Sequence, residues 1–161
     1  MRAVKFKGLV DTHGLGLSGM WALMSDQGCR RELSKSTPSP IAASEVVEMI
    51  EQPHGGRRLR VTVHYEENKF PWPLSNRHAC FASCSRLRAD GASRISCEAT
   101  VDHEVAVQRA GRSGVIWRYV NTVMLAEEDG KVALTVSSLF DISGDIPLSL
   151  MDNLLESMGD V

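Results

Sequence analysis

The residues of this sequence that are best suited to acid–base chemistry are histidines and acidic residues scattered along the chain. Its five histidines are His13, His54, His64, His78 and His103. None has a His-x-x-His or Cys-x-x-Cys neighbour, so the sequence predicts no metal site. His103 lies between Asp102 and Glu104, but a solvated turn at a strand end explains these three residues without catalysis. The best pair for an enzyme is His64 with Glu98, and catalysis would require both to face into one cavity.

Motifs for nucleophilic or phosphate chemistry are absent from the sequence. The Gly-Leu-Gly at residues 14–16 is too short for a phosphate-binding loop, and no Gly-x-Ser-x-Gly occurs. Four cysteines are present: Cys29, Cys80, Cys84 and Cys97. On one strand Cys80 and Cys84 would lie about 13 Å apart, beyond the ~7 Å limit for a disulfide. We therefore predict reduced structural thiols, no enzyme and no cofactor.

Three arginines are candidates for binding an anionic group. If Arg77 points inward, its buried charge must be paired or bound to an anion, because an unpaired buried charge is very costly. If it points to the proline-rich corner that precedes it, it bonds the backbone carbonyls there, which is the interpretation we favour. Arg30 and Arg31 lie in a polar stretch, and they are either solvated loop charges or head-group contacts.

Length and composition are those of a single soluble globular domain. The chain has 161 residues, of which 43% are apolar and 24% charged, with a net charge of −2. No basic run interleaves with aromatic residues, so nucleic acid is not an expected partner. No apolar run approaches the ~20 residues that span a bilayer, and the N-terminus lacks the apolar core of a signal peptide. The sequence therefore predicts a cytoplasmic protein.

Alternating apolar and polar residues predict a series of antiparallel strands that must position these groups. The predicted strands are residues 2–10, 58–69, 77–88, 94–103, 114–126 and 131–142. Leu17, Met20, Trp21 and Met24 recur at helical spacing and predict an amphipathic helix that ends at Ser25. Residues 26–40 are expected to be a loop or a short irregular helix, and residues 105–113 a polar loop.

The C-terminal segment is expected to form a long amphipathic helix. Pro147 lies near its first turn, and the apolar stripe consists of Leu150, Met151, Leu154, Leu155 and Met158. A curved sheet that packs on such a helix with few large side chains at its centre leaves a cavity. We expect a mostly apolar cavity with a few polar groups, as in small-ligand sites.

The stretch Phe70-Pro71-Trp72-Pro73-Leu74-Ser75-Asn76-Arg77 resembles the Pro-aromatic-Pro-Leu-Ser-Asn-Arg-Asp signature of START domains, the lipid-binding modules related to the steroidogenic acute regulatory protein. His78 stands where the family has Asp. Residues 140–147 resemble the family's entry into its C-terminal helix. Arg30 and Arg31 match an Arg-Lys-x-Trp-Asp pattern that lies at the lipid head group in some members, but the Trp and Asp are absent here.

The resemblance covers nearly the whole chain and implies an α+β helix-grip fold, a curved antiparallel sheet packed on the C-terminal helix. It makes residues 41–51 a strand, although their composition also suits a helix. It implies one domain, residues 1–161, without the family's first helix and first two strands. Strand 2–10 should then lie beside strand 131–141 and form a sheet edge through which the chain self-associates.

The implied function is non-catalytic binding, with intermembrane transfer, of a lipid or sterol, and transient contact with a membrane surface. The predicted ligand contacts are Arg77, Arg30, Arg31, Val61, Val63, Trp117, Val136, Leu150 and Leu154. The C-terminal helix and the loop at residues 105–114 are the expected moving parts. One alternative is a degenerate START module for protein interaction, which a cavity below ~300 Å³ would favour. The other is a small-molecule enzyme on the same fold that uses His64 and Glu98.

Overall fold

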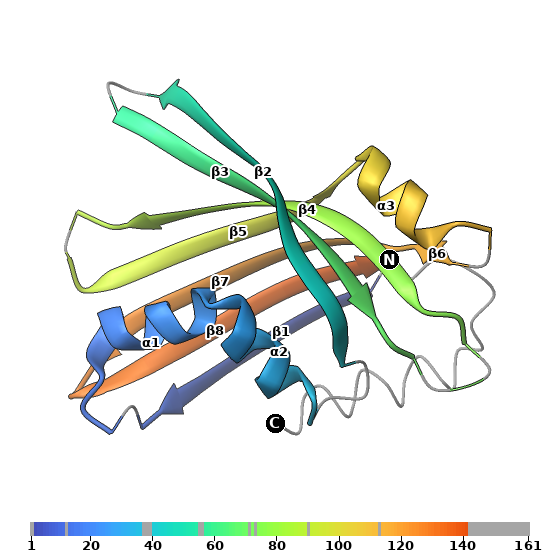
Figure 1. Cartoon of the computed structure of the whole chain (residues 1–161). Helices are drawn as coiled ribbons and strands as arrows, with labels where there is room; N and C mark the ends of the chain where they lie inside the picture. The colour runs from blue at the N-terminus through green and yellow to red at the C-terminus, as the bar shows by residue number, and fades with distance from the viewer. Residues whose placement is uncertain are drawn as a thin grey trace.

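The structure is a computed structural model that describes residues 2–11, 13–36, 40–54, 57–70, 72, 74–89, 91–112 and 114–141. One sheet of eight strands forms its framework (Figure 1). The strands are β1 (Arg2–Val10), β2 (Ile41–His54), β3 (Arg57–Asn68), β4 (Arg77–Leu87), β5 (Ser93–Val101), β6 (Val115–Ile116), β7 (Arg118–Glu128) and β8 (Lys131–Asp141). The helices of this part of the chain are α1 (Gly16–Ser25), α2 (Gln27–Ser34) and α3 (Glu104–Ala110).

The strands follow the order β1-β8-β7-β5-β4-β3-β2, and β6 pairs in parallel with the start of β4. All the other pairings are antiparallel, as hairpins in series require. β1 pairs with β8 from Arg2 opposite Phe140 to Val10 opposite Val132. The predicted neighbourhood of these two strands is confirmed, and so is the strand predicted for residues 41–51.

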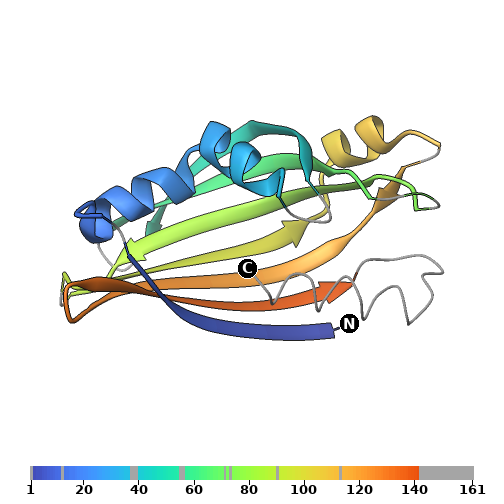
Figure 2. The same cartoon turned by 90° about the horizontal axis from the view of Figure 1, so that it is seen from below.

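The two faces of the sheet can be told apart by the alternation of side chains along β3. Thr62, His64 and Glu66 face α1 and α2, and this side is called the inner face. Val63 and Tyr65 face α3, and this side is called the outer face. The strands curve around the inner face, with α1 and α2 lying across it (Figure 2).

The helices of the inner face meet at Asp26. The residue is extended, with φ −76° and ψ 123°, so α1 ends there, and its carboxylate accepts the Cys29 N–H at 2.8 Å to cap α2. Leu17 of α1 packs with Leu125 and Val132 in a core cluster that Met20, Trp21, Met24 and Leu134 extend. The predicted apolar stripe of the first helix therefore packs on β7 and β8. The polar stretch after it contains a regular helix, α2.

α3 packs on the outer face, where the sequence analysis predicted a polar loop. That prediction is wrong, because His103 is extended and its Nδ1 accepts the Val105 N–H at 3.2 Å, which caps a short helix. The small residues Ala106 and Ala110 are buried and let this helix approach the sheet closely. Together with Val63, Tyr65 and Cys80, Ala106 forms an apolar cluster.

β3 and β4 pair only over part of their length. Their ladder runs from Asn68 opposite Arg77 to Thr62 opposite Ser83. Beyond it β3 stays with β2 as far as Arg57, and β4 stays with β5 as far as Leu87. The two hairpins therefore diverge beyond this ladder and leave a gap between the ribbons of β3 and β4, as Figure 1 shows.

One predicted strand is divided in the structure, and the predicted C-terminal helix cannot be compared with it. The strand predicted for residues 114–126 is two strands, β6 and β7, separated at Trp117. The predicted C-terminal helix, with Leu150 and Leu154, lies outside the described residues, as do Pro71 and Pro73 of the corner.

Candidate functional site

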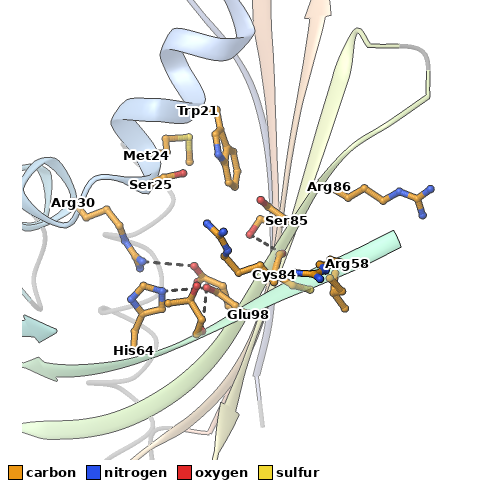
Figure 3. Close-up of a pocket in the computed structure, with 15 residues that line it drawn as sticks. Trp21, Met24, Ser25, Arg30, Arg58, His64, Cys84, Ser85, Arg86 and Glu98 are labelled. Atoms are coloured by element: carbon orange, nitrogen blue, oxygen red, sulfur yellow. Dashed lines mark hydrogen bonds and ion pairs between the residues drawn. The ribbon is translucent and has the colours of Figure 1, made fainter. Parts of the chain in front are cut away.

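A cavity of about 810 Å³ lies between the inner face and the helices α1 and α2, beside the gap between β3 and β4. Its described lining comprises Trp21, Met24, Ser25, Arg30, Arg58, Leu59, Arg60, Thr62, His64, Ser83, Cys84, Ser85, Arg86, Ser96 and Glu98. In Figure 3 Trp21 and Met24 reach into it from α1, whereas Arg86 points away. Most of the described lining is polar or charged, so the expectation of a mostly apolar wall is wrong for this part of the chain.

Arg30 of α2 joins the helix to three strands of the inner face. Its guanidinium lies 3.2 Å from Glu66 Oε1 of β3 and 3.6 Å from Glu98 Oε1 of β5. It also lies 5.5 Å from the centre of the Phe81 ring on β4, within the range of a cation–π contact. Burial acts to lower the Arg30 pKa, but the two carboxylates outweigh it and the pKa is raised. Arg30 is therefore a fixed cation in the site.

Glu66 is the most deeply buried ionisable group of this cluster. Only 4% of its surface is exposed, and burial raises its pKa to about 7, against the opposing effect of Arg30. The nearby Glu98 carboxylate raises the pKa further, and Ser44 lowers it. Its Oε1 forms the ion pair with Arg30 without good hydrogen-bond geometry. Glu66 therefore changes its charge close to neutral pH.

His64 lies at the centre of a chain of hydrogen bonds over the same surface. Its Nδ1 contacts the Gln27 amide, which in turn accepts from Ser44, and its Nε2 lies 3.1 Å from Ser83 Oγ. Burial, together with the Arg30 charge, lowers the His64 pKa to about 4. His64 is therefore neutral at physiological pH, and both ring nitrogens are occupied.

The polar groups continue across the sheet towards β8. Asn121 of β7 donates to Glu98 Oε2 at 3.3 Å and accepts from Ser138 of β8 at 2.7 Å. We call the groups on the inner face from Ser44 to Ser138 the polar band; they are Ser44, His64, Glu66, Ser83, Glu98, Asn121 and Ser138, with Gln27 and Arg30 of α2. Sequence analysis missed Glu66, Asn121 and Ser138 as site residues, although strand alternation with His64 would have placed Glu66 on the same face.

Aromatic residues fill the inner face on the side of the proline-rich corner. Trp117 stacks on Phe140, with ring centres 6.1 Å apart, and meets Phe70 edge-on at 6.4 Å. The Arg77 guanidinium lies 5.4 Å from the centre of the Phe70 ring. Two buried donors here, Asn68 Nδ2 and Trp117 Nε1, have no hydrogen-bond partner among the described residues. A buried donor that stays unpaired in a closed core is costly.

The predicted ligand contacts fall into separate places. Arg30 lines the cavity, and Trp117 lies in the aromatic region with Arg77, which is 3% exposed and donates to the Ser75 carbonyl. Val63 is 4% exposed in the cluster under α3, on the outer face, away from the cavity. Val61 precedes it by two residues and takes the same face by alternation.

The remaining predicted contacts take different positions. Val136 of β8 lies opposite Phe6 and Val123, half-buried, and Arg31 is exposed on α2. Neither lines the cavity. Leu150 and Leu154 lie outside the described residues, so the list of ligand contacts stays a prediction.

The described residues offer two further findings about binding chemistry. No group of three or more His, Cys, Asp or Glu in this part of the chain could hold a metal ion. Among the helices described, none is both long enough and apolar enough to cross a bilayer.

Comparison with known proteins identifies the fold. No family model and no curated protein matches the sequence. A STAR-related lipid transfer protein fragment from Xanthomonas axonopodis matches with a TM-score of 0.72 at 18% identity, over 99% of this chain and 81% of that one. Human StAR-related lipid transfer protein 5 matches with a TM-score of 0.76 at 15% identity, over 96% of this chain and 68% of that one.

A third solved structure has the same arrangement. The lipid transfer and protein localization domain of human StarD13 matches with a TM-score of 0.66 at 14% identity, over 98% of this chain and 75% of that one. The chain therefore has the START fold, an α+β helix-grip fold, and the predicted fold class is confirmed. At these identities the likeness establishes the fold alone.

Proposed function

We propose that this protein binds one lipid or sterol between the inner face and the helices, without changing it chemically, and transfers it between membranes. The observation that carries the proposal is the cavity of about 810 Å³ under α1 and α2. This volume lies within the ~300–1,000 Å³ range of small-molecule sites. The structural neighbours named as lipid transfer proteins support the same class of ligand.

The distribution of side chains suits a ligand with a polar end. Trp21, Met24 and Leu59 supply apolar wall, while Ser83 and Glu98 supply hydrogen-bonding groups. Arg30 is already paired with two carboxylates, so an anionic head group would have to displace one of them. A head group that hydrogen-bonds without a net negative charge is therefore favoured.

The two rival functions are weaker. A degenerate module with a filled interior requires a cavity below ~300 Å³, and the observed cavity is about 810 Å³. An enzyme remains the second candidate, because His64 and Glu98 both line the cavity. Their polar atoms are engaged, however: His64 with Gln27 and Ser83, and Glu98 with Arg30 and Asn121. Neither is free to act as a general base.

The test is native mass spectrometry of the purified chain, with extraction and identification of bound lipid. We expect a fraction of molecules to carry one lipid or sterol that is recovered unchanged. Ser85→Trp should reduce that fraction about tenfold, because it fills the cavity at a residue whose side chain forms no hydrogen bond with the described part of the chain.

Val107→Trp on exposed α3 is the matched control and should bind like the wild type. A chain that carries no lipid and takes up none from vesicles would overturn the proposal. Recovery of a chemically altered ligand would favour the enzyme. Membrane contact, cytoplasmic location and self-association through a sheet edge stay predictions.

A further inference from the structure

Two of the four cysteines lie directly opposite one another, on neighbouring strands. Cys84 of β4 is the register partner of Cys97 of β5. Both thiols are free, Cys97 is exposed and Cys84 is half-buried. Spacing along a single strand excludes the pair Cys80 and Cys84, but it says nothing of a pair across two strands. The antiparallel register brings together two thiols that are far apart in sequence.

The distance between the two backbones suits a disulfide. The Arg88 N–H bonds the Ser93 carbonyl at 2.9 Å, and counting back in twos from this pair makes Cys84 and Cys97 a hydrogen-bonded pair. Such pairs have Cα atoms about 5.5 Å apart, inside the range of roughly 4.4–6.8 Å for disulfides. Cβ atoms of opposite residues are about 4.5–5.5 Å apart, and hydrogen-bonded pairs take the wider end of this range. This is wider than the ~3.8 Å of a relaxed disulfide, so the strands must move towards each other to close the bond.

The surroundings give the two sulfurs different roles. Cys97 is on the surface, and the Thr122 hydroxyl points to its sulfur at 3.9 Å. Burial raises the pKa of the Cys84 thiol, and a charge on Cys97 raises it further. Cys97 is thus the sulfur that a reagent in solution reaches first, and Cys84 is placed to react second.

The place of the pair in the sheet also allows movement. The ladder between β3 and β4 ends at Ser83, so Cys84 is the first residue of β4 that, within the described sheet, has β5 as its only neighbouring strand. The backbone there can adjust without breaking a second ladder. A disulfide closed with some strain on the surface is readily reduced again, as reversible redox pairs require.

We propose that Cys84 and Cys97 form a dithiol site that low-molecular-weight disulfides such as oxidised glutathione convert reversibly into a cross-strand disulfide. In the first step the Cys97 thiolate attacks one sulfur of oxidised glutathione, which forms a mixed disulfide and releases one glutathione thiolate. In the second step Cys84, after losing its proton, attacks the Cys97 sulfur and releases the second glutathione. The protein loses two hydrogens, and one oxidised glutathione becomes two reduced ones.

The experiment is intact mass spectrometry of the purified chain after incubation with oxidised glutathione, followed by alkylation without reduction. The wild type should lose two hydrogens, carry no glutathione and keep two alkylatable cysteines. Cys84→Ser should stop at the first step and carry one glutathione per chain on Cys97. Cys97→Ser should acquire glutathione more slowly, because its remaining partner is half-buried. Reduced glutathione should return the wild type to four thiols.

Cys29→Ser is the matched control and should behave as the wild type, because Cys29 lies in α2, away from the pair. A wild type that gains glutathione without losing hydrogens would overturn the proposal. So would a disulfide that persists in Cys84→Ser, or one mapped to Cys29 or Cys80. The readout needs no lipid, so its outcome is independent of the proposed ligand.

Discussion

Two arginines anchor helices on opposite faces of this sheet, with similar partners and very different surroundings. Arg30 of α2 pairs with Glu66 and Glu98 and lies 5.5 Å from the Phe81 ring centre. Arg109 of α3 pairs with Glu45 at 2.9 Å and lies 5.8 Å from the ring centre of Tyr65. The Arg109 ion pair is shorter than either ion pair of Arg30. Its side chain, however, is 58% exposed, against 24% for Arg30.

Burial, not distance, decides what each arginine does. An exposed ion pair is weakened by solvent and contributes little, whereas removal of one partner from a buried pair leaves uncompensated charge. The outer face under α3 is a small apolar core with its charges at the rim. The inner face keeps charges and a cavity under its helices. The outer face is therefore expected to contribute to stability alone, whereas the inner face also carries binding and titration.

The largest expected effect is the loss of the Arg30 charge. Arg30→Met keeps much of the packing on Phe81 but leaves Glu66 and Glu98 without their cation, and it should lower the free energy of unfolding by roughly 3–5 kcal/mol. The loss should be greater at pH 8 than at pH 5, because Glu66, with a pKa of about 7, is protonated at the lower pH. Urea unfolding at both pH values measures it.

The neighbouring Arg31→Met serves as control, because Arg31 is exposed and forms no ion pair within the described residues. It should change the free energy of unfolding by less than about 0.5 kcal/mol. Equal losses in the two variants would show that the arginine on the inner face is no more important than one on the surface.

The second effect is a pH dependence in which two inner-face groups oppose each other. Burial raises the Glu66 pKa from 4.5 to about 7, so its contribution to stability is present at low pH and is lost as pH rises through that window. At 1.36 kcal/mol per pH unit this corresponds to about 3 kcal/mol. Burial lowers the His64 pKa from 6.5 to about 4, so its contribution is present above pH 6.5 and is lost as pH falls.

Single substitutions should separate the two opposing dependences of stability on pH. In Glu66→Gln stability should rise with pH between about 4 and 6.5, relative to the wild type, because only the His64 contribution remains. In His64→Asn stability should fall as the pH rises from 4.5 to about 7. Arg30, Glu98 and Tyr119 face the same groups and remain in both variants. If stability changes with pH in the same way in both variants and the wild type, Glu66 and His64 of the polar band do not titrate as described.

The third effect tests the outer face as a source of stability alone. Val63→Ala removes two methyl groups from a side chain that is 4% exposed, among Tyr65, Cys80 and Ala106. We expect a loss of about 2 kcal/mol in the free energy of unfolding. The fraction of chains with bound lipid, measured well below the midpoint of unfolding, should not change. A specific loss of lipid would return Val63 to the ligand contacts.

The comparison of faces also explains how much the sequence could predict. The hairpins follow from alternation, which is a local signal. The place of β1 beside β8 follows from the START resemblance, which implies the order of the strands in the whole sheet. Alternation along β3 separates Val63 from His64 but does not say which set faces the cavity. Val61 and Val63 were chosen as ligand contacts because they are apolar, whereas the described cavity wall is largely polar.

Side-chain contacts between distant segments could not be predicted from the sequence. Arg30 was recognised as a candidate, but its partners Glu66 and Glu98 come from strands far along the chain. The pair Cys84 and Cys97 needs the exact register of β4 and β5. In a hairpin the length of the turn sets that register, and strand bounds predicted to within a residue or two do not fix the turn. α3 was missed because a helix of seven residues with a histidine cap carries little periodic signal.

The smallest expected effect completes the comparison, because Arg109 is the exposed counterpart of Arg30. Arg109→Met removes the ion pair with Glu45 but leaves the buried face of α3, Ala106 and Ala110, in place. Exposed pairs contribute about 0.2–1 kcal/mol, and the nearby Tyr65 ring adds at most a similar amount. The loss should be below about 1 kcal/mol, and 1 M salt should reduce it further, since salt screens exposed charges. The Arg30→Met loss should change little with salt. Urea unfolding of both variants at low and high salt measures the contrast, and a large, salt-insensitive loss at Arg109 would show that exposure does not separate the two faces.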